Sequence, residues 1–251
     1  MTTLYQFTFS HFCEKARWAL DRKSVDYQTR DLLPGLHVEP ARRVAPSTSL
    51  PILVDEHGAT QGSSAILDHL DRHHPRRSLT PAGGDLAQEA RGWEARLDEE
   101  VGVTVRLWFY HHTLQDRRLA LGFLTRGAPW HGRLVLSILF PRLRRVMRER
   151  MGIDAATATR AEDRFRRALD DLDAALERKP FLVGESFSRA DLTACALLEP
   201  LCAPGRARDE LGFPEAVLAV RDELSSRPFF AWVVETYATQ RSHGGSGPAR
   251  R

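Results

Sequence analysis

The chain has 251 residues, 42% of them hydrophobic and 27% charged, which is typical of a soluble globular protein of one or two domains. Its 36 basic and 33 acidic residues leave a formal charge of +3, too small an excess to favour nucleic acid as a partner. No membrane span is expected, because the longest uncharged apolar run covers only residues 134–140 and a span needs roughly 20 residues.

The first 75 residues combine short apolar runs with helical periodicity. Residues 4–9, 25–30 and 49–54 are expected strands, since each is a short run with apolar, aromatic or β-branched residues next to turn residues. A hairpin turn at residues 55–58 leads to a fourth strand. Helices are expected at about 12–23 and at 63–73, with a short helical turn at 39–43. This order predicts a small α/β domain.

Two features at the end of this segment predict a ligand site. Leu50 and Pro51 enter the third strand, where a proline is tolerated because its position needs no ladder donor. The extended backbone of Leu50 can pair with a peptide-like ligand. Ser63 stands where a helix N-cap belongs, and a helix N-terminus can hold a carboxylate. Together these features predict a site for a small acidic peptide.

A cluster of turn residues marks a domain boundary. Pro75, Pro81, Gly83 and Gly84 lie between two periodic segments, as in a linker. The last eleven residues contain Gly-Gly-Ser-Gly-Pro, a composition typical of disorder. We therefore divide the chain into an N-terminal domain, a linker, a helical domain and a disordered tail. Their ranges are 1–78, 79–85, 86–240 and 241–251.

Beyond the linker, apolar residues recur with the 3.6-residue period of α-helices. Such stripes cover residues 86–101 and 165–176, and a final helix is expected at 229–237. A break at 127–132 precedes a basic amphipathic segment from Arg133 to Arg150, which predicts either a bundle helix or a surface for a partner or membrane. We favour the bundle helix.

One helix start carries three local signals. Ser188 is the expected N-cap, and Asp191 can return a hydrogen bond from position N3. Phe187 and Leu192 stand at the two positions of a hydrophobic staple. The apolar sequence that follows, which includes Cys195, predicts a helix buried in the bundle.

Four segments in this order resemble those of the glutathione S-transferase superfamily. They correspond to an active-site turn with the first helix, a Leu-Pro element, a γ-glutamyl-binding motif and a capping box with its staple. Their residues are 10–17 (SHFCEKAR), 50–51 (LP), 62–66 (GSSAI) and 187–191 (FSRAD). The resemblance implies an α/β thioredoxin-like N-terminal domain followed by an all-α helical-bundle domain.

The resemblance also implies roles for individual residues. Ser10 stands where the family holds the residue that addresses the glutathione sulfur, and its hydroxyl would stabilise the thiolate. Leu50 would pair its backbone with the cysteinyl unit, next to a cis Pro51. Ser63 would hold the γ-glutamyl carboxylate. The residue before it usually binds the γ-glutamyl amine as glutamine or an acid, and here it is Gly62.

Two further positions near this motif are basic or polar. Arg42 or Arg43 could meet the glycyl carboxylate of the peptide, and the sequence does not choose between them. Gln61 is adjacent to the motif, but its side chain is expected on the other face of the strand.

Several residues have a plainer interpretation. Ser10 could simply cap the first helix. Cys13 is expected to be a packed thiol, because a serine stands at the position where a disulfide partner would lie. His11 is expected at the surface, and Asp98 to Glu100 at the exposed end of a helix. Residues 108–110 are expected to fill the core and to line a second-substrate pocket.

The function implied by the resemblance is that of an enzyme. It would activate the thiol of its co-substrate glutathione for attack on a small electrophile, in conjugation, isomerisation or reductive displacement. No metal is expected to take part, since neither HExxH nor paired CxxC occurs. The alternative is a non-catalytic binding or scaffold protein of the same fold, which Gly62 and the basic segment favour.

Assembly and location are also expectations. Family members are usually dimers, so the resemblance implies a homodimer. Three cysteines without a disulfide framework fit a reducing compartment. The N-terminus lacks the pattern of a signal peptide. We therefore expect a cytoplasmic protein.

Overall fold

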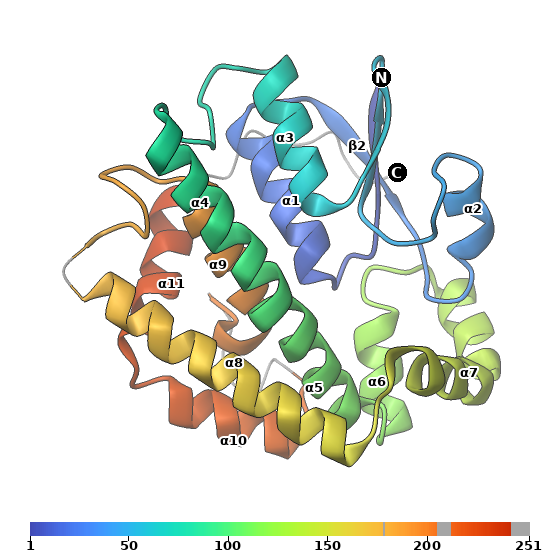
Figure 1. The fold of residues 1–251 in the computed structure, drawn as a ribbon. Helices are drawn as coiled ribbons and strands as arrows, with labels where there is room; N and C mark the ends of the chain where they lie inside the picture. The colour runs from blue at the N-terminus through green and yellow to red at the C-terminus, as the bar shows by residue number, and fades with distance from the viewer. Residues whose placement is uncertain (178, 205–211, 242–251) are drawn as a thin grey trace.

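The computed structural model describes residues 1–177, 179–204 and 212–241. An N-terminal domain built on a four-stranded sheet is followed by a domain of helices (Figure 1). The predicted fold class, a thioredoxin-like α/β domain followed by an all-α bundle, is confirmed.

The N-terminal sheet has the strand order β2-β1-β3-β4. β1 runs parallel to β2 and antiparallel to β3, and β3 pairs antiparallel with β4. A crossover helix, α1, joins the two parallel strands, since parallel strands cannot be joined by a hairpin. The bounds are β1 Thr2–Gln6, α1 His11–Arg22, β2 Tyr27–Asp31, α2 Val38–Arg42, β3 Ile52–Asp55, β4 Gly58–Gln61 and α3 Ser63–His73.

The predicted elements of this domain are present, with shifted ends. β1 stops at Gln6 rather than at residue 9, because Phe7 and Phe9 lie in the turn before α1, where their rings stack at 5.4 Å. β3 begins at Ile52, so Leu50 and Pro51 precede the sheet ladder.

The helical domain begins with one long helix in which a π-helical turn, η1, joins α4 to α5 (Figure 1). The bounds are α4 Gly84–Leu97, η1 Asp98–Val103, α5 Thr104–Thr113, α6 Arg117–Leu124, α7 Trp130–Met151, α8 Ala155–Leu176, α9 Arg189–Cys202, α10 Glu215–Leu224 and α11 Pro228–Gln240. The sequence pattern missed α6 and α10, which are too short to display several helical periods. No helix in the described ranges is long and apolar enough to cross a membrane.

The predicted tail falls outside the described residues, except for Arg241. The prediction of disorder is wrong for this residue, because its guanidinium forms ion pairs with Glu14 at 2.9 Å and with Asp21 at 2.6 Å. Both partners lie on α1, so the end of α11 is fastened to the N-terminal domain. The predicted linker, 79–85, overlaps the start of α4 at Gly84.

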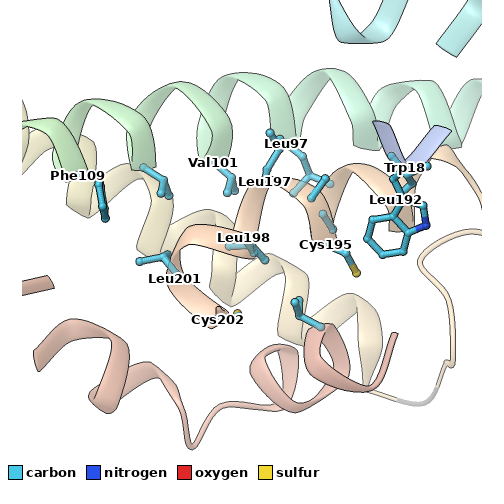
Figure 2. Packing of buried hydrophobic residues seen from close by; sticks show 14 of the residues in the cluster. Trp18, Leu97, Val101, Phe109, Leu192, Cys195, Leu197, Leu198, Leu201 and Cys202 are labelled. Carbon is cyan, nitrogen blue, oxygen red and sulfur yellow. The ribbon is translucent and has the colours of Figure 1, made fainter. Parts of the chain in front are cut away.

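Helix α9 lies at the centre of the hydrophobic core. Every residue of α9 is buried except Glu199, and the helix packs against α1, α4 and α11. Figure 2 shows Leu197 of α9 beside Leu97 of α4, with Trp18 of α1 near the start of α9. Since α1 belongs to the sheet domain, this helix joins the cores of the two domains. Cys195 is fully buried there, as predicted.

The predicted capping box at the start of α9 is confirmed. The Ser188 hydroxyl accepts a hydrogen bond from the backbone of Ala190 at 3.3 Å, and the Asp191 carboxylate accepts one from the Ser188 backbone at 2.8 Å. The same carboxylate also accepts hydrogen bonds from the Ser188 hydroxyl at 2.9 Å and from the Leu182 backbone at 2.7 Å. Burial raises the pKa of Asp191 above its usual range, against the effect of these hydrogen bonds.

We expect Asp191→Ala to destabilise the fold far more than the loss of an ordinary helix cap. It leaves two buried N–H groups without an acceptor, which costs roughly 3 kcal/mol. The free energy of unfolding from urea titration measures this loss. Asp116→Ala is the matched control, since Asp116 caps α6 at an exposed position and its loss costs about 1 kcal/mol. Equal losses in the two variants would contradict the prediction.

Candidate functional site

A cavity of about 560 Å³ opens between the two domains. The N-terminal domain supplies one wall, with Leu50, Pro51 and the start of α3. The long helix of the second domain supplies the facing wall, with Asp98 and Arg106, and Phe12 of α1 also lines the cavity.

The peptide bond between Leu50 and Pro51 is cis, as the resemblance implied. The carbonyl oxygen of Pro51 accepts a hydrogen bond from the backbone N–H of Gly62 at 3.0 Å. The β3–β4 ladder begins only at Ile52, so the backbone of Leu50 lies at the cavity and outside the sheet. An extended ligand can therefore pair with it as an added strand would.

Helix α3 presents its N-terminus to the same cavity. Gly62 is its N-cap residue and Ser63 its first helical residue, so the prediction of Ser63 as N-cap is wrong by one position. Gly62 has φ +97°, a conformation that disfavours any side chain. No side chain in the described part of the chain caps the helix, so its first N–H groups are suited to an anion.

Gln61 lines the cavity, but its amide holds the loop that precedes Leu50. Its Nε2 donates to the carbonyl oxygens of Ser47 at 2.9 Å and Ser49 at 2.8 Å, and its Oε1 accepts from the Ser47 backbone at 3.3 Å. The amide is therefore used in shaping the cavity wall and is not free to bind a ligand.

Asp98 is a cavity residue that the sequence pattern missed. Its Oδ2 accepts a hydrogen bond from the Ser64 hydroxyl at 2.6 Å, and its two oxygens lie 2.8 and 2.9 Å from Lys15 Nζ. The prediction of an exposed helix end is wrong for Asp98, because the long helix continues through η1 and Asp98 faces α3 from within it. The sequence carries no local signal for this contact, because the partner Lys15 is 83 residues away in the chain.

Ser10 lies apart from the four other predicted site residues. It caps α1, with its Oγ accepting from the Cys13 backbone at 3.4 Å. It lines a second, smaller cavity of about 20 Å³, whose wall includes Phe109, Tyr110 and Arg106. Arg106 lines both cavities, so the two hollows adjoin at this side chain.

Two residues next to Ser10 are buried. Cys13 is fully inaccessible, and burial raises the pKa of its thiol, so it is a packed thiol as predicted. The prediction of a surface position is wrong for His11, which is 4% exposed. Burial, followed by the charge of Arg106, lowers the pKa of His11 to about 3, so the ring is neutral at physiological pH. No cluster suited to a metal occurs in the described part of the chain.

Arg106 supplies positive charge at both cavities. The sequence pattern had instead indicated Arg42 or Arg43 as the arginine that could meet a carboxylate of the ligand. Its guanidinium lies 5.5 Å from the centre of the Phe12 ring, and its Nε is buried without a hydrogen-bond partner among the described residues. Arg42 and Arg43 are exposed on and just after α2, and neither lines the large cavity.

Comparisons of sequence identify relatives of this chain. The family profile described as "Glutathione S-transferase, N-terminal domain" matches residues 4–78, and "Glutathione S-transferase, C-terminal domain" matches residues 129–228. The glutathione S-transferase TCHQD of Arabidopsis thaliana is 26% identical over 211 residues, which cover 79% of this chain and 76% of the relative.

Solved structures share the fold. A glutathione S-transferase from Rhodospirillum rubrum F11 aligns with a TM-score of 0.61 at 19% identity, over 96% of this chain and all of the other. One from Methylobacterium radiotolerans, in complex with glutathione sulfonate, aligns with a TM-score of 0.58 at 22% identity, over 93% and 94% of the two chains.

We expect the three cysteines of the native protein to be inert toward the thiol reagent DTNB at pH 8. All are at most 1% exposed, burial raises the pKa of each thiol, and only a thiolate reacts. Thionitrobenzoate absorbance should therefore stay at baseline in the native protein and reach three equivalents in urea.

Ser10→Cys is the control for this measurement. It places a thiol at the N-terminus of α1, which favours the thiolate, so one rapid equivalent should appear. A rapid equivalent in the native wild-type protein that disappears in Cys13→Ala would contradict the packed-thiol interpretation.

Proposed function

The chain belongs to the glutathione S-transferase superfamily, and from this membership we propose that it binds glutathione and activates its thiol for attack on a small electrophile. The observation that carries the proposal is that Leu50, Pro51, Gly62 and Ser63 line one cavity, which Phe12 in the first turn of α1 also lines. In a conjugation, sulfur bonds to the electrophilic carbon, the leaving group departs with its electron pair, and the thiol proton passes to solvent.

The peptide would lie between the cis-proline turn and the start of α3. The Leu50 backbone pairs with the cysteinyl unit. Ser63 and the uncapped N–H groups of α3 hold the γ-glutamyl carboxylate. Asp98 takes the γ-glutamyl amine, because Gly62 has no side chain to do so and Asp98 lies within hydrogen-bond distance of Ser64 on the facing wall.

Ser10 would stabilise the thiolate while it caps α1. A serine hydroxyl has one donor and two acceptor sites, and the Cys13 backbone occupies only an acceptor. The hydroxyl proton therefore remains able to bond a thiolate, and the N-terminus of α1 adds a favourable potential. The capping role and the chemical role are compatible.

The electrophile would lie in the large cavity at Arg106, where the smaller cavity adjoins it. At about 20 Å³ the smaller cavity holds no more than a water molecule, but its largely aromatic wall, from Phe9, Phe109 and Phe123, suits contact with the apolar end of a substrate. Arg106 faces this cavity with a charge that would stabilise electron density developing on the substrate or its leaving group. Conjugation, isomerisation and reductive displacement all begin from the same thiolate.

A scaffold protein of the same fold is the second candidate, favoured by Gly62. Affinity for glutathione separates the two, since the enzyme requires it and the scaffold does not. On the family resemblance alone, we also propose that the protein is a cytoplasmic homodimer.

Calorimetric titration with glutathione tests the proposed function. We expect Ser63→Ala to raise the Kd roughly 30-fold, because it removes a hydrogen bond to a charged group worth about 2 kcal/mol. Ser10→Ala should keep the affinity, but the ultraviolet absorbance of the bound thiolate should appear only at higher pH. If the wild-type protein shows no binding at millimolar glutathione, the proposal fails and the scaffold function is favoured.

The role of Asp98 predicts a specific coupling to the ligand's amine. Asp98→Asn should weaken glutathione binding about tenfold more than it weakens the binding of a glutathione analogue that lacks the γ-glutamyl amino group, because loss of the ion pair with Lys15 affects both ligands. Glu100→Gln is the matched control, because Glu100 lies on the same turn, η1, but does not line the cavity. Equal weakening of both ligands by Asp98→Asn would assign Asp98 a purely structural role.

A further inference from the structure

Helix α7 carries a row of large apolar side chains in solvent. Trp130 is 76% exposed, Leu134 55% and Ile138 71%. Their spacing of four residues places them on one face of the helix. Val135 and Leu139, each 40% exposed, widen this face. Exposed apolar patches of this kind mark interaction sites. We call these five residues the apolar face of α7.

The opposite side of α7 fixes which way the apolar face points. Leu136 and Phe140 are 1% and 3% exposed, buried in the core. Arg117 of α6 donates to the Ser137 hydroxyl at 2.7 Å and to its carbonyl oxygen at 3.1 Å. Figure 1 shows α6 and α7 at one side of the helical domain, below α2. The helix is therefore held by one side, with its apolar face directed outward.

The second half of α7 is strongly basic. Arg142 and Arg145, four and seven residues after Ile138, continue the outward face and are exposed. The helix contains one glutamate and six arginines: Arg133, Arg142, Arg144, Arg145, Arg148 and Arg150. Its net charge of +5 exceeds the +3 of the whole chain, so the rest of the chain is net acidic. Positive charge is concentrated on this one helix.

We propose that α7 holds the protein on the surface of a bilayer that contains anionic lipid. An apolar face with a tryptophan at one end, continued by arginines, is the pattern of a helix that lies in the lipid interface. Anionic headgroups complement the charge of +5, while the apolar face enters the acyl boundary. The apolar stretch is too short to span the bilayer.

Other occupants fit these observations less well. A second copy of the chain would bring another helix of charge +5 against the first. Protein partners typically anchor in pockets, and neither cavity described above includes a residue of α7. A lipid surface needs no pocket and complements both the charge and the apolar face.

Sedimentation of the full chain with lipid vesicles tests this proposal. We expect binding to vesicles of phosphatidylglycerol and phosphatidylcholine, no binding to phosphatidylcholine alone, and a loss of binding at high salt.

Leu134→Gln with Ile138→Gln should abolish binding. Arg142→Gln with Arg145→Gln should weaken it about 30-fold. Arg72→Gln with Arg167→Gln is the matched control, because it removes two exposed charges from α3 and α8 and should leave binding unchanged.

Quenching by brominated lipids locates the contact. Trp130 should be quenched on vesicle binding, and Trp130→Phe should remove most of the quenching. Trp18 and Trp108 are buried, and the half-buried Trp93 and Trp232 lie on other helices, α4 and α11. Failure to bind anionic vesicles would overturn the proposal, as would equal weakening by the α3–α8 control. Conversion of a dimer to a monomer by Leu134→Gln with Ile138→Gln, in light scattering, would instead assign the face to a second copy. Glutathione affinity should be unchanged in the α7 variants, so this result is independent of the proposed function.

Discussion

Lys15 carries its ammonium group in a fully buried position, and the geometry of the site depends on how that charge is satisfied. Its Nζ lies 2.8 Å from carboxylate oxygens of both Glu94 and Asp98, and it donates to the Ser64 hydroxyl at 3.0 Å. A buried ammonium is costly unless it is paired and hydrogen-bonded. The four side chains come from α1, α3 and the long helix of the second domain. The buried charge of Lys15 therefore holds α1, α3 and the long helix together at one point, and these three elements form part of the cavity wall.

A second buried cation extends this network to the centre of the core. Arg189, at the start of α9, binds Glu94 at 2.5 Å and Asp68 of α3 at 2.7 Å. Burial would raise the pKa of Glu94, but Lys15 and Arg189 outweigh it and hold this pKa below its usual range. Glu94 is therefore ionised at neutral pH, and the two domains are held together by α9 packing and by this network. These ion pairs favour a single orientation of the two domains relative to each other, because breaking one pair leaves a buried charge unpaired.

The sequence predicts those parts of the fold and site that depend on neighbouring residues. The capping box in residues 187–192 and the motif at 62–66 are local patterns, so their helices were located closely. Asp98 and His11 were misjudged because their surroundings depend on the approach of another domain. At Asp98 a π-helical turn also shifts the helical phase, so a 3.6-residue period does not predict which side chains face inward. The partner that draws Asp98 inward, Lys15, is 83 residues away in the chain, beyond any local pattern.

The same π-helical turn also positions the N-terminus of α1. A Cβ on Gly102 would lie 2.6 Å from the Phe12 ring and 3.1 Å from Leu197, so only glycine allows α1 and α9 to approach the long helix this closely. The ring of His11 lies close enough to the Gly102 backbone for that backbone to affect its pKa. His11 and Phe12 directly follow Ser10, so the residue proposed to address the thiol is oriented from the helical domain as well as from its own turn. The position of Ser10 relative to the cavity is therefore a property of the packed pair of domains, which explains why neither domain's sequence pattern alone specifies the site.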